Sequence, residues 1–380
     1  MRILIAAPCP QQREGGVANV VHNSAESLRA RGHDVSCIFR EQLLPQPVAF
    51  PRFEMLYFAA RLAREVQRRR NELDVVVIHA PAGFAYGVFR RWHLVRGLPP
   101  YVMFLHGLEQ RRNHAMKREA KKGRAWHFRF KNRVWQHLYH MPLYRLSITS
   151  ADQAIVINRE TWSLLQLYYH LETGRVWYIP NGIESRFFVS RDYPNGCANR
   201  LLFAGTWLDH KGVYYLSEGF ATLAGRFPDV RLTVVGCGVD AETVKLAFSP
   251  KTRERVQVLP FVPRSEMLAL YAQHDIFVLP SLMEGLPIVL LEAMASGMPV
   301  VTTETCGMMD VVEDEHNGLL VKPADSPAFA SAVERLMTSG ELRRTLGCNA
   351  QQAMRRHTWE RAAEQLEKVL QLAVEEAGRT

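Results

Sequence analysis

Two glutamates, Glu284 and Glu292, enclose a segment whose residue types predict a strand, a turn and the start of a helix. A run of four apolar residues precedes them, and Pro287 suits a first helical turn because proline has no amide hydrogen to leave unpaired there. The amides of Gly285 and Leu286 then lie at the helix start, where the helix dipole attracts an anion. Each glutamate alone also fits an exposed surface acid, but the whole segment predicts a diphosphate site.

The two carboxylates are expected to have different roles at this site. Glu284 lies on the turn, where it can accept hydrogen bonds from the hydroxyls of a sugar. Glu292 lies five residues beyond Pro287, and a rise of about 1.5 Å per residue places it roughly 7–8 Å further along the helix axis. This position suits hydrogen bonds to both ribose hydroxyls of a nucleotide. The pair is therefore interpreted as a clamp around a diphosphate, with Glu284 on the sugar side.

Residues after two other apolar runs predict further contacts to the same ligand. Lys211 precedes a glycine in a loop, so its ammonium group can reach a phosphate, although a lysine beside a glycine is also common on protein surfaces. Gly236 opens the pattern G-x-G-x-x-A, which is the dinucleotide fingerprint. The acid that would bind an adenosine ribose is missing at the end of the next apolar run, Val256–Leu259. We therefore expect a mononucleotide pocket.

The first half of the chain offers two weaker signals. Gly15 and Gly16 open an amphipathic stretch after the first apolar run, where paired glycines bring backbone amides close to an anion. A flexible turn explains this dipeptide equally well. His106 ends the apolar run Tyr101–Leu105, and ligands bind at the carboxyl ends of parallel strands. A structural histidine is the alternative, because the chain contains 14 histidines.

Short apolar runs alternate with amphipathic stretches along nearly the whole chain, which predicts parallel strands covered by helices on both faces. In the first half the expected strands are 3–7, 35–39, 75–78, 101–105, 154–157 and 176–179, and the expected helices include 16–31, 52–70 and 160–170. In the second half the expected strands are 201–204, 232–235, 256–259, 276–279 and 300–302, and the expected helices include 287–296 and those after Pro327.

A polar, irregular segment after Pro180-Asn181-Gly182 interrupts this alternation and predicts a linker. The fold class is therefore α/β, with two doubly wound Rossmann-like domains that face each other across a cleft. The length of 380 residues suits two such domains, and the 47% hydrophobic and 22% charged residues are typical of a globular protein. No apolar run reaches the roughly 18–20 residues of a membrane span. The six cysteines show no metal-binding spacing, so we expect a cytoplasmic protein.

Taken together, these motifs resemble those of the retaining glycosyltransferases of family 4, the group 1 glycosyl transferases, which have the GT-B fold. The E-x7-E element from Glu284 to Glu292 is the hallmark of that family, and the other motifs stand in the family's usual order. The resemblance covers nearly the whole chain. It implies that residues 1–183 bind the acceptor and residues 184–357 bind the nucleotide sugar. It also implies that a C-terminal helix, at about 358–380, crosses back onto the first domain.

The resemblance assigns a role to each residue of the donor site. Lys211 would bind the diphosphate, Glu292 would bind the ribose, and Glu284 would contact the hydroxyls of the donor sugar. The contacts to the base would come largely from the backbone around Phe261 and Val262. Of the candidate residues in the first domain, His106 would lie near the transferred sugar and Gly16 would meet the diphosphate.

Two departures from the family pattern concern the donor contacts. The family often has arginine five residues before Lys211, and this chain has Thr206 there. One cationic phosphate contact is then missing, or another residue supplies it. The segment Cys306–Asp310 also replaces a more usual glycine-rich stretch that ends in glutamate, so the donor contact at this point stays open.

The reaction is expected to need no metal and no cofactor, because no D-x-D motif is present to carry a divalent ion. The helix start and Lys211 can stabilise the leaving diphosphate instead. The family retains the anomeric configuration, and no carboxylate of this chain can be assigned as a covalent nucleophile. We therefore expect a front-face route, in which the leaving phosphate helps to deprotonate the acceptor hydroxyl.

The net charge of +9 is concentrated between Arg111 and Arg145, where 11 lysines and arginines accompany one acid, Glu119. Residues 124–135 interleave cations with aromatics, as at an anionic bilayer surface. By the family's layout this segment belongs to the acceptor domain. We expect it to bind an anionic membrane surface, at the inner face of the plasma membrane, and a polyprenyl-diphosphate-linked acceptor. A helix with inward aromatics and solvated cations is an equal alternative. Nucleic acid is not an expected partner, because no nucleic-acid-binding motif accompanies the charge.

The predicted function is thus transfer of a sugar from a nucleotide diphosphate sugar to a hydroxyl of a glycan or lipid-linked acceptor, in the assembly of surface polysaccharide or glycolipid. Two alternative functions stay open, and two others lack a motif that they would need. A catalytically inactive nucleotide-sugar-binding protein would explain Thr206, and a nucleotide-sugar epimerase would share the fold. A phosphorylase would need a lysine motif for pyridoxal phosphate that is not found. A nicotinamide oxidoreductase would need the missing ribose acid.

Overall fold

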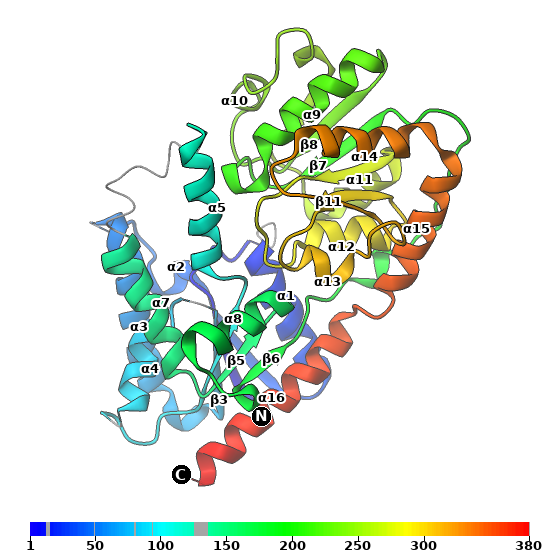
Figure 1. Ribbon diagram of the computed structural model, residues 1–380. Coiled ribbons are helices and arrows are strands. Elements are labelled where there is room, and N and C mark those ends of the chain that lie inside the picture. Colours follow the sequence, from blue (N-terminus) through cyan, green and yellow to red (C-terminus); the bar gives the residue numbers. More distant parts are fainter. Residues whose placement is uncertain (13–15, 49, 80, 93, 125–135, 380) are drawn as a thin grey trace. The chain divides into compact units, whose positions relative to one another are not determined.

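The computed structural model describes residues 1–12, 16–48, 50–79, 81–92, 94–124 and 136–379 and divides the chain into two compact units. The first unit comprises Met1–Glu109, Arg129–Gly182 and Trp359–Thr380, and the second comprises Gln110–Phe128 and Ile183–Thr358. Each unit is an α/β body with its own parallel sheet (Figure 1). The predicted fold class, two Rossmann-like α/β units, is confirmed.

The first unit is built on six parallel strands in the order β2-β1-β3-β4-β5-β6. The strands are β1 (Arg2–Ala6), β2 (Asp34–Ile38), β3 (Val75–His79), β4 (Tyr101–Leu105), β5 (Gln153–Val156) and β6 (Val176–Tyr178). Every residue of β3 and β4 is buried, because helices cover both faces of such a sheet and its strands are apolar throughout. The helices are α1 (Gly16–Ala30), α2 (Arg40–Leu43), α3 (Glu54–Arg68), α4 (Phe84–Arg91), α7 (Met141–Ser150), α8 (Arg159–Tyr169) and α16 (Trp359–Arg379).

The C-terminal helix α16 packs on this first sheet, as Figure 1 shows in red. Its buried residues recur every three or four positions and include Ala363, Leu366, Leu370 and Ala373, which is the spacing of a helix with one apolar face. Glu367 also accepts hydrogen bonds from Arg31 Nε at 2.7 Å and from His33 Nε2 at 2.8 Å. The helix therefore belongs to the first unit although it ends the chain.

The second unit is built on six parallel strands in the order β12-β11-β10-β7-β8-β9. The strands are β7 (Arg200–Ala204), β8 (Arg231–Val235), β9 (Val256–Leu259), β10 (Ile276–Leu279), β11 (Val300–Thr303) and β12 (Leu319–Val321). The helices are α5 (Glu109–Lys121), α9 (Val213–Arg226), α10 (Ala241–Lys245), α11 (Met267–Gln273), α12 (Ile288–Ala295), α13 (Met308–Val311), α14 (Ser326–Thr338) and α15 (Gly340–Met354). The predicted strands all form, with ends shifted by at most one residue, while β12 was not predicted.

Helix α5 is where the division of the chain differs from the predicted domains 1–183 and 184–357. Residues 110–128 interrupt the first unit in sequence but belong to the second. The reason is a set of polar contacts: the hydroxyl of Tyr215, on α9, donates to both carboxylate oxygens of Glu119 at 2.8 Å. The Lys122 ammonium also donates to the Tyr215 hydroxyl at 2.8 Å. The basic stretch predicted for the acceptor domain is thus tied in part to the other unit.

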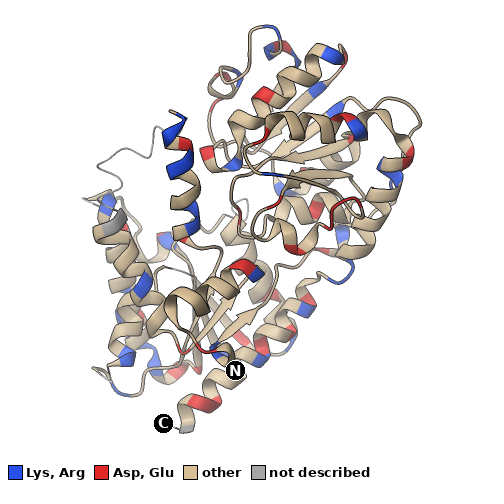
Figure 2. Cartoon of the chain, viewed as in Figure 1, with Lys and Arg blue, Asp and Glu red and all other residues tan. Residues whose placement is uncertain are grey.

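Positive charge is concentrated on α5, whose lysines and arginines stand out in Figure 2. Most of the predicted aromatic and cationic segment, residues 125–135, lies outside the described residues. Across the parts of the chain that the structure describes, no helix is both long enough and apolar enough to cross a membrane.

Candidate active site

The loop after β10 brings together two motifs that lie far apart in sequence. The Lys211 ammonium is 2.6 Å from Glu284 Oε1, and the Ser281 hydroxyl donates to the same oxygen at 2.8 Å. Both charged side chains are mostly buried, with 16% of Lys211 and 9% of Glu284 exposed. The structure therefore places the predicted phosphate-binding lysine and the predicted sugar-binding glutamate in one ion pair. Ser281 was not predicted, although its place at the end of an apolar run could have indicated it.

Glycine is required at position 212 for this ion pair to form. Gly212 has a φ of 73°, and a Cβ atom added there would lie 1.8 Å from the carbonyl oxygen of Pro280. The Leu282 amide donates to the His210 carbonyl at 2.7 Å. A residue with a side chain at position 212 would push the loop that carries Lys211 away from the end of β10, so Gly212 fixes where the lysine lies.

Helix α12 begins at Ile288, one residue later than its predicted start. Pro287 precedes the helix with an extended backbone, at a ψ of 118°, so the prediction that it lies within the first turn is wrong by one residue. The carbonyl of Gly285 accepts a hydrogen bond from the Gly307 amide at 3.0 Å. A Cβ atom added to Gly307 would lie 2.1 Å from that carbonyl. The Cys306–Asp310 segment, which departs from the family pattern, thus packs directly on Gly285-Leu286.

Glu292 lies in a separate, fully buried cluster. It is 1% exposed, the Tyr271 hydroxyl donates to its Oε2 at 2.9 Å, and a terminal nitrogen of Arg264 is 2.5 Å from its Oε1. Burial raises the pKa of the Glu292 carboxyl, and the charge of Arg264 and the hydrogen bond from Tyr271 oppose that rise. Arg264 also lies 2.6 Å from Glu184. The two predicted clamp residues therefore have different partners.

Arg264 and Tyr271 are functional candidates that the sequence did not reveal. Arg264 lies in the polar stretch that follows β9, and Tyr271 lies on the short helix α11. A cation in a loop and a tyrosine on an amphipathic helix are common features without ligand-binding roles. Only the folded chain shows that both contact the Glu292 carboxylate, so no spacing in the sequence could have identified them.

The remaining predicted donor residues follow the carboxyl ends of neighbouring strands. Thr206 comes after β7, Gly236 after β8, and Phe261 and Val262 after β9, while Glu284 comes after β10. Because β10, β7, β8 and β9 are consecutive in the sheet, these residues gather at one edge, the position where ligands bind in doubly wound sheets. Thr206 is exposed, and Phe261 is 63% exposed, so the fold buries neither side chain.

A histidine beside the lysine stays uncharged. The pKa of His210 is lowered to about 4, mainly by burial. The positive charges of Lys211 and Arg112 also lower this pKa, and the negative charge of Glu284 opposes the change. Neutral His210 leaves Lys211 as the cation that pairs with Glu284. Within the described residues, no group of three or more His, Cys, Asp or Glu is arranged to hold a metal ion. Transfer without a metal stays a prediction.

The first unit contains the other predicted catalytic residue. His106 follows β4, and its Nε2 lies 2.6 Å from Nδ1 of His79, the last residue of β3. One ring must donate and the other accept, so the two rings cannot both be protonated at these nitrogens. Gly16 begins α1, with open space where a side chain would be, while Gly15 lies outside the described residues. His79 was not predicted, although it lies at the carboxyl end of an apolar strand, as His106 does.

We expect the His106 ring to stay neutral down to about pH 5, because burial lowers its pKa to about 4. Burial and the charge of His106 also lower the pKa of His79 well below its usual value. Unfolded imidazoles protonate near pH 6.5, so above that pH the lowered pKa values of these two residues do not affect stability. As the pH falls from about 6.5 toward 4, the unfolded state takes up protons that the folded state does not, and the free energy of unfolding should decrease.

Imidazole nitrogen NMR spectra over a pH series would test this expectation, with His106→Gln used to assign the signals. Constant His106 shifts from about pH 8 to pH 5 are expected. A His106 titration with a midpoint near pH 6.5, the ordinary imidazole value, would show that the charged ring is tolerated and would contradict the inference.

Comparison with known proteins adds a family relationship to this geometry. The model of the group 1 glycosyl transferases matches residues 193–353, and that of glycosyltransferase family 4 matches residues 14–187. An uncharacterized glycosyltransferase of Methanocaldococcus jannaschii is 26% identical, over 97% of each chain. A sucrose-phosphate synthase of Thermosynechococcus elongatus has a TM-score of 0.78 at 19% identity, covering 98% of this chain and 99% of that one. The Anabaena protein HepE, in complex with UDP and glucose, has a TM-score of 0.70 at 19% identity, covering 98% and 99%.

Proposed function

We propose, from the premise that this chain belongs to the group 1 glycosyltransferases of the family 4 type, that its second unit binds a nucleotide diphosphate sugar and its first unit binds the acceptor. The chain is a glycosyltransferase, and its reaction is glycosyl transfer from a nucleotide sugar. The observation that carries the donor site is the Lys211–Glu284 ion pair at the carboxyl edge of the second sheet.

The ion pair suggests how the donor is recognised. A diphosphate beside Lys211 would share the ammonium group with Glu284, because an ammonium has three hydrogens to donate. Glu284 would then accept hydrogen bonds from the donor sugar, and the start of α12 would add favourable dipole charge at the phosphates. When the bond between the anomeric carbon and the phosphate oxygen breaks, its electron pair passes to the phosphate oxygen and positive charge develops on the sugar. Lys211 stabilises the negative charge of the diphosphate that departs.

Retention of the anomeric configuration, without a metal, is part of the proposal. In a front-face route the acceptor oxygen bonds to the anomeric carbon on the side from which the diphosphate leaves. The proton of the acceptor hydroxyl passes to the leaving phosphate oxygen, so no side chain has to act as a covalent nucleophile. His106, neutral near pH 7, would act as a hydrogen-bonding group for the transferred sugar.

The nucleotide end of the donor is assigned to the cluster around Glu292. Its carboxylate would accept hydrogen bonds from the ribose hydroxyls and would give up part of its contact with Arg264. Arg264 would keep its ion pair with Glu184. The base would lie by the backbone of Phe261 and Val262, next to Gly236. Thr206 provides no cation for the diphosphate, which leaves Lys211 as the main charge among the predicted donor residues.

The acceptor, the pathway and the location are proposed from the family resemblance and the charge distribution. We assign the acceptor to the hydroxyl of a glycan or of a polyprenyl-diphosphate-linked sugar, in surface polysaccharide or glycolipid assembly. The basic stretch 111–145 would hold the protein peripherally on an anionic membrane of the cytoplasmic side. An inactive nucleotide-sugar-binding protein is the alternative function, and it would bind the same donors without turnover.

A thermal-shift panel of nucleotide diphosphates and their sugars tests the donor site. A ligand present at 100 times its Kd stabilises the native state by about 2.7 kcal/mol, and we expect the diphosphates of one base to raise Tm by several degrees. Lys211→Met should reduce that shift, while Lys251→Met, outside the site, serves as the control. If no nucleotide raises Tm, the proposed donor site is wrong, and binding without turnover would favour the inactive alternative.

A further inference from the structure

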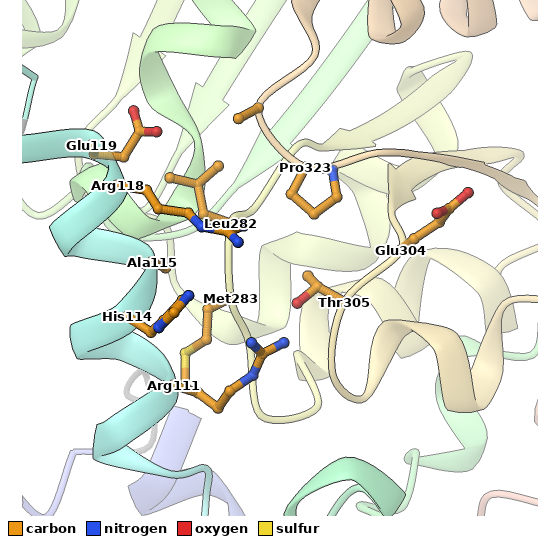
Figure 3. Close-up of a pocket in the computed structure, with 11 residues that line it drawn as sticks. Arg111, His114, Ala115, Arg118, Glu119, Leu282, Met283, Glu304, Thr305 and Pro323 are labelled. Carbon is orange, nitrogen blue, oxygen red and sulfur yellow. The ribbon is translucent and has the colours of Figure 1, made fainter. Parts of the chain in front are cut away.

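A cavity of about 260 Å³ lies within the second unit, between α5 and the loops that follow β10, β11 and β12 (Figure 3). From α5 it is lined by Arg111, His114, Ala115, Arg118 and Glu119. From the loops it is lined by Leu282, Met283, Glu304, Thr305, Pro323 and Ala324. Its volume lies just below the roughly 300–1,000 Å³ of small-molecule sites, so it suits one chemical group with its immediate surroundings.

The wall contributed by α5 is cationic. Arg111, His114 and Arg118 are spaced i, i+3 and i+7, which places them on one face of a helix. A helix face that packs on a protein is usually apolar, yet this face directs two guanidinium groups toward the protein. Figure 3 shows the side chains of Arg111 and Arg118 extending from α5 toward the loop that carries Leu282 and Met283.

The negative charge available within the cavity is small. Glu119 is 2% exposed, and its carboxylate already accepts hydrogen bonds from the Tyr215 hydroxyl and lies 3.4 Å from the Lys122 ammonium. The other acid of the lining is Glu304, on the opposite wall. Two guanidinium groups thus line the cavity from α5, while the Glu304 carboxylate points away from α5 in Figure 3. A lining of this composition attracts an anion.

Helix α5 is held against the second unit by contacts at its C-terminal end. The Glu119, Tyr215 and Lys122 contacts anchor its C-terminal turn, and Arg124 adds an ion pair with Glu218 at 2.5 Å. Arg111 and Arg118 line the cavity apart from these anchors. The cationic face can thus change its partner without release of the helix.

We propose that this cavity binds a phosphate or diphosphate group carried by the acceptor. The fork of a guanidinium group matches two phosphate oxygens at once, and two arginines together match a doubly charged group. Leu282 and Met283 directly precede Glu284, and Thr305 lies two residues before Gly307, which contacts Gly285. The cavity therefore adjoins the sugar end of the donor site, away from the Glu292 cluster. The inference rests on the proposed function and refines it, because it assigns the phosphate group of the acceptor to the second unit.

Two sources could supply this phosphate group, and they share its chemistry. One is the phosphate ester of a small water-soluble sugar, and the other is the diphosphate of a polyprenyl lipid. Glucose 1-phosphate represents the first source as a probe, and farnesyl diphosphate represents the second. Farnesol, which has the same hydrocarbon chain and no phosphate, measures binding that depends on the chain alone.

The test measures the Kd of each probe by equilibrium dialysis, with the donor site filled by the nucleotide diphosphate that gives the largest thermal shift. We expect Arg111→Ala/Arg118→Ala to weaken the better phosphate probe by about 10- to 100-fold. Lys117→Ala/Lys121→Ala removes the same charge from α5 outside the cavity lining, so it should change the Kd by less than about threefold. Glu304→Gln removes the acid of the opposite wall and should tighten phosphate binding severalfold, a gain that a disturbed fold cannot produce.

Three outcomes would overturn the inference. One is an equal loss in the two double variants, which would show a general charge effect of α5. Another is a loss of nucleotide diphosphate binding in Arg111→Ala/Arg118→Ala, which would make these arginines donor contacts that replace the arginine missing at Thr206. The third is binding of farnesol as tight as that of farnesyl diphosphate. Failure of the proposed function would give a different result, because no nucleotide would then bind the unchanged protein. Binding of the phosphate probes to the cavity can still be measured in Lys211→Met.

Discussion

Glu284→Ala is expected to lower the rate of sugar transfer by about 10³-fold, while nucleotide diphosphate binds at least as tightly as before. The two effects separate because the Glu284 carboxylate pairs with the Lys211 ammonium at 2.6 Å. Removing the carboxylate removes a proposed contact to the donor sugar. It also leaves the Lys211 charge without its present partner, so the ammonium becomes more available to the phosphates.

Substitution of Lys211, the other residue of the ion pair, should instead weaken the binding of nucleotide diphosphate. Lys211→Met leaves the Glu284 carboxylate mostly buried, beside the place proposed for a diphosphate. Like charges then repel, and nucleotide diphosphate binding should weaken by about 10-fold or more, which corresponds to about 1.4 kcal/mol. Calorimetric titration with the diphosphate identified by thermal shift gives the Kd, and transfer kinetics with the matching nucleotide sugar give kcat.

Ser281→Ala is the matched control for Glu284→Ala. It removes the 2.8 Å hydrogen bond to the same carboxylate oxygen but keeps the ion pair, so it should cost less than about 10-fold in rate. Turnover at the unchanged rate in Glu284→Ala would exclude Glu284 from the reaction. A parallel loss of diphosphate binding in Glu284→Ala would instead show that the ion pair holds the loop together.

The sequence alone allowed most of the fold to be predicted, because the buried strands of a parallel sheet are apolar along their whole length. Strands β4, β9 and β10 form at the predicted residues. Strand β12 was missed because Leu319, Leu320 and Val321 make a run of only three residues, too short to distinguish from a buried loop. The family resemblance added the domain roles, which no pattern of apolar residues contains.

The candidate site was predictable only where its residues follow a strand in a recognisable order. Lys211 and Glu284 lie after β7 and β10, and the sheet order puts these strands side by side. Arg264, Tyr271 and the α5 cavity depend on contacts between segments far apart in sequence. Helix α5 has few apolar residues, so its periodicity could not indicate a packing partner. The contact that places it, Tyr215 with Glu119, joins residues 96 positions apart.

The largest expected effect on stability comes from Arg264. Arg264→Met should lower the free energy of unfolding of the second unit by about 3–5 kcal/mol, because it leaves a buried carboxylate without its cation. Glu292 is 1% exposed, and the Tyr271 hydroxyl can compensate only part of its charge. Hydrogen exchange in the strands of the second sheet measures this unit by itself, so unfolding of the first unit does not obscure the result.

Arg335→Met provides the control, because it breaks an ion pair of similar length at the surface of the same unit. Arg335 and Glu315 are 48% and 53% exposed and lie 2.6 Å apart, and such pairs contribute about 0–1 kcal/mol. A loss of protection in Arg335→Met as large as that in Arg264→Met would show that burial of the Arg264 pair is not what matters.

The double variant Arg264→Met/Glu292→Gln separates the loss of an interaction from the cost of an uncompensated charge. Glutamine is neutral and can still accept the hydrogen bond from Tyr271, so the double variant should be more stable than Arg264→Met alone. If breaking a buried pair costs more than removing both charges, at least half of the lost stability should return. If the double variant is as unstable as the single one, Arg264 acts through its contacts with Glu184 and the Phe187 ring, 5.6 Å from its guanidinium carbon. The Glu292 carboxylate would then tolerate burial without a cation, which would leave it available to the ribose of the donor.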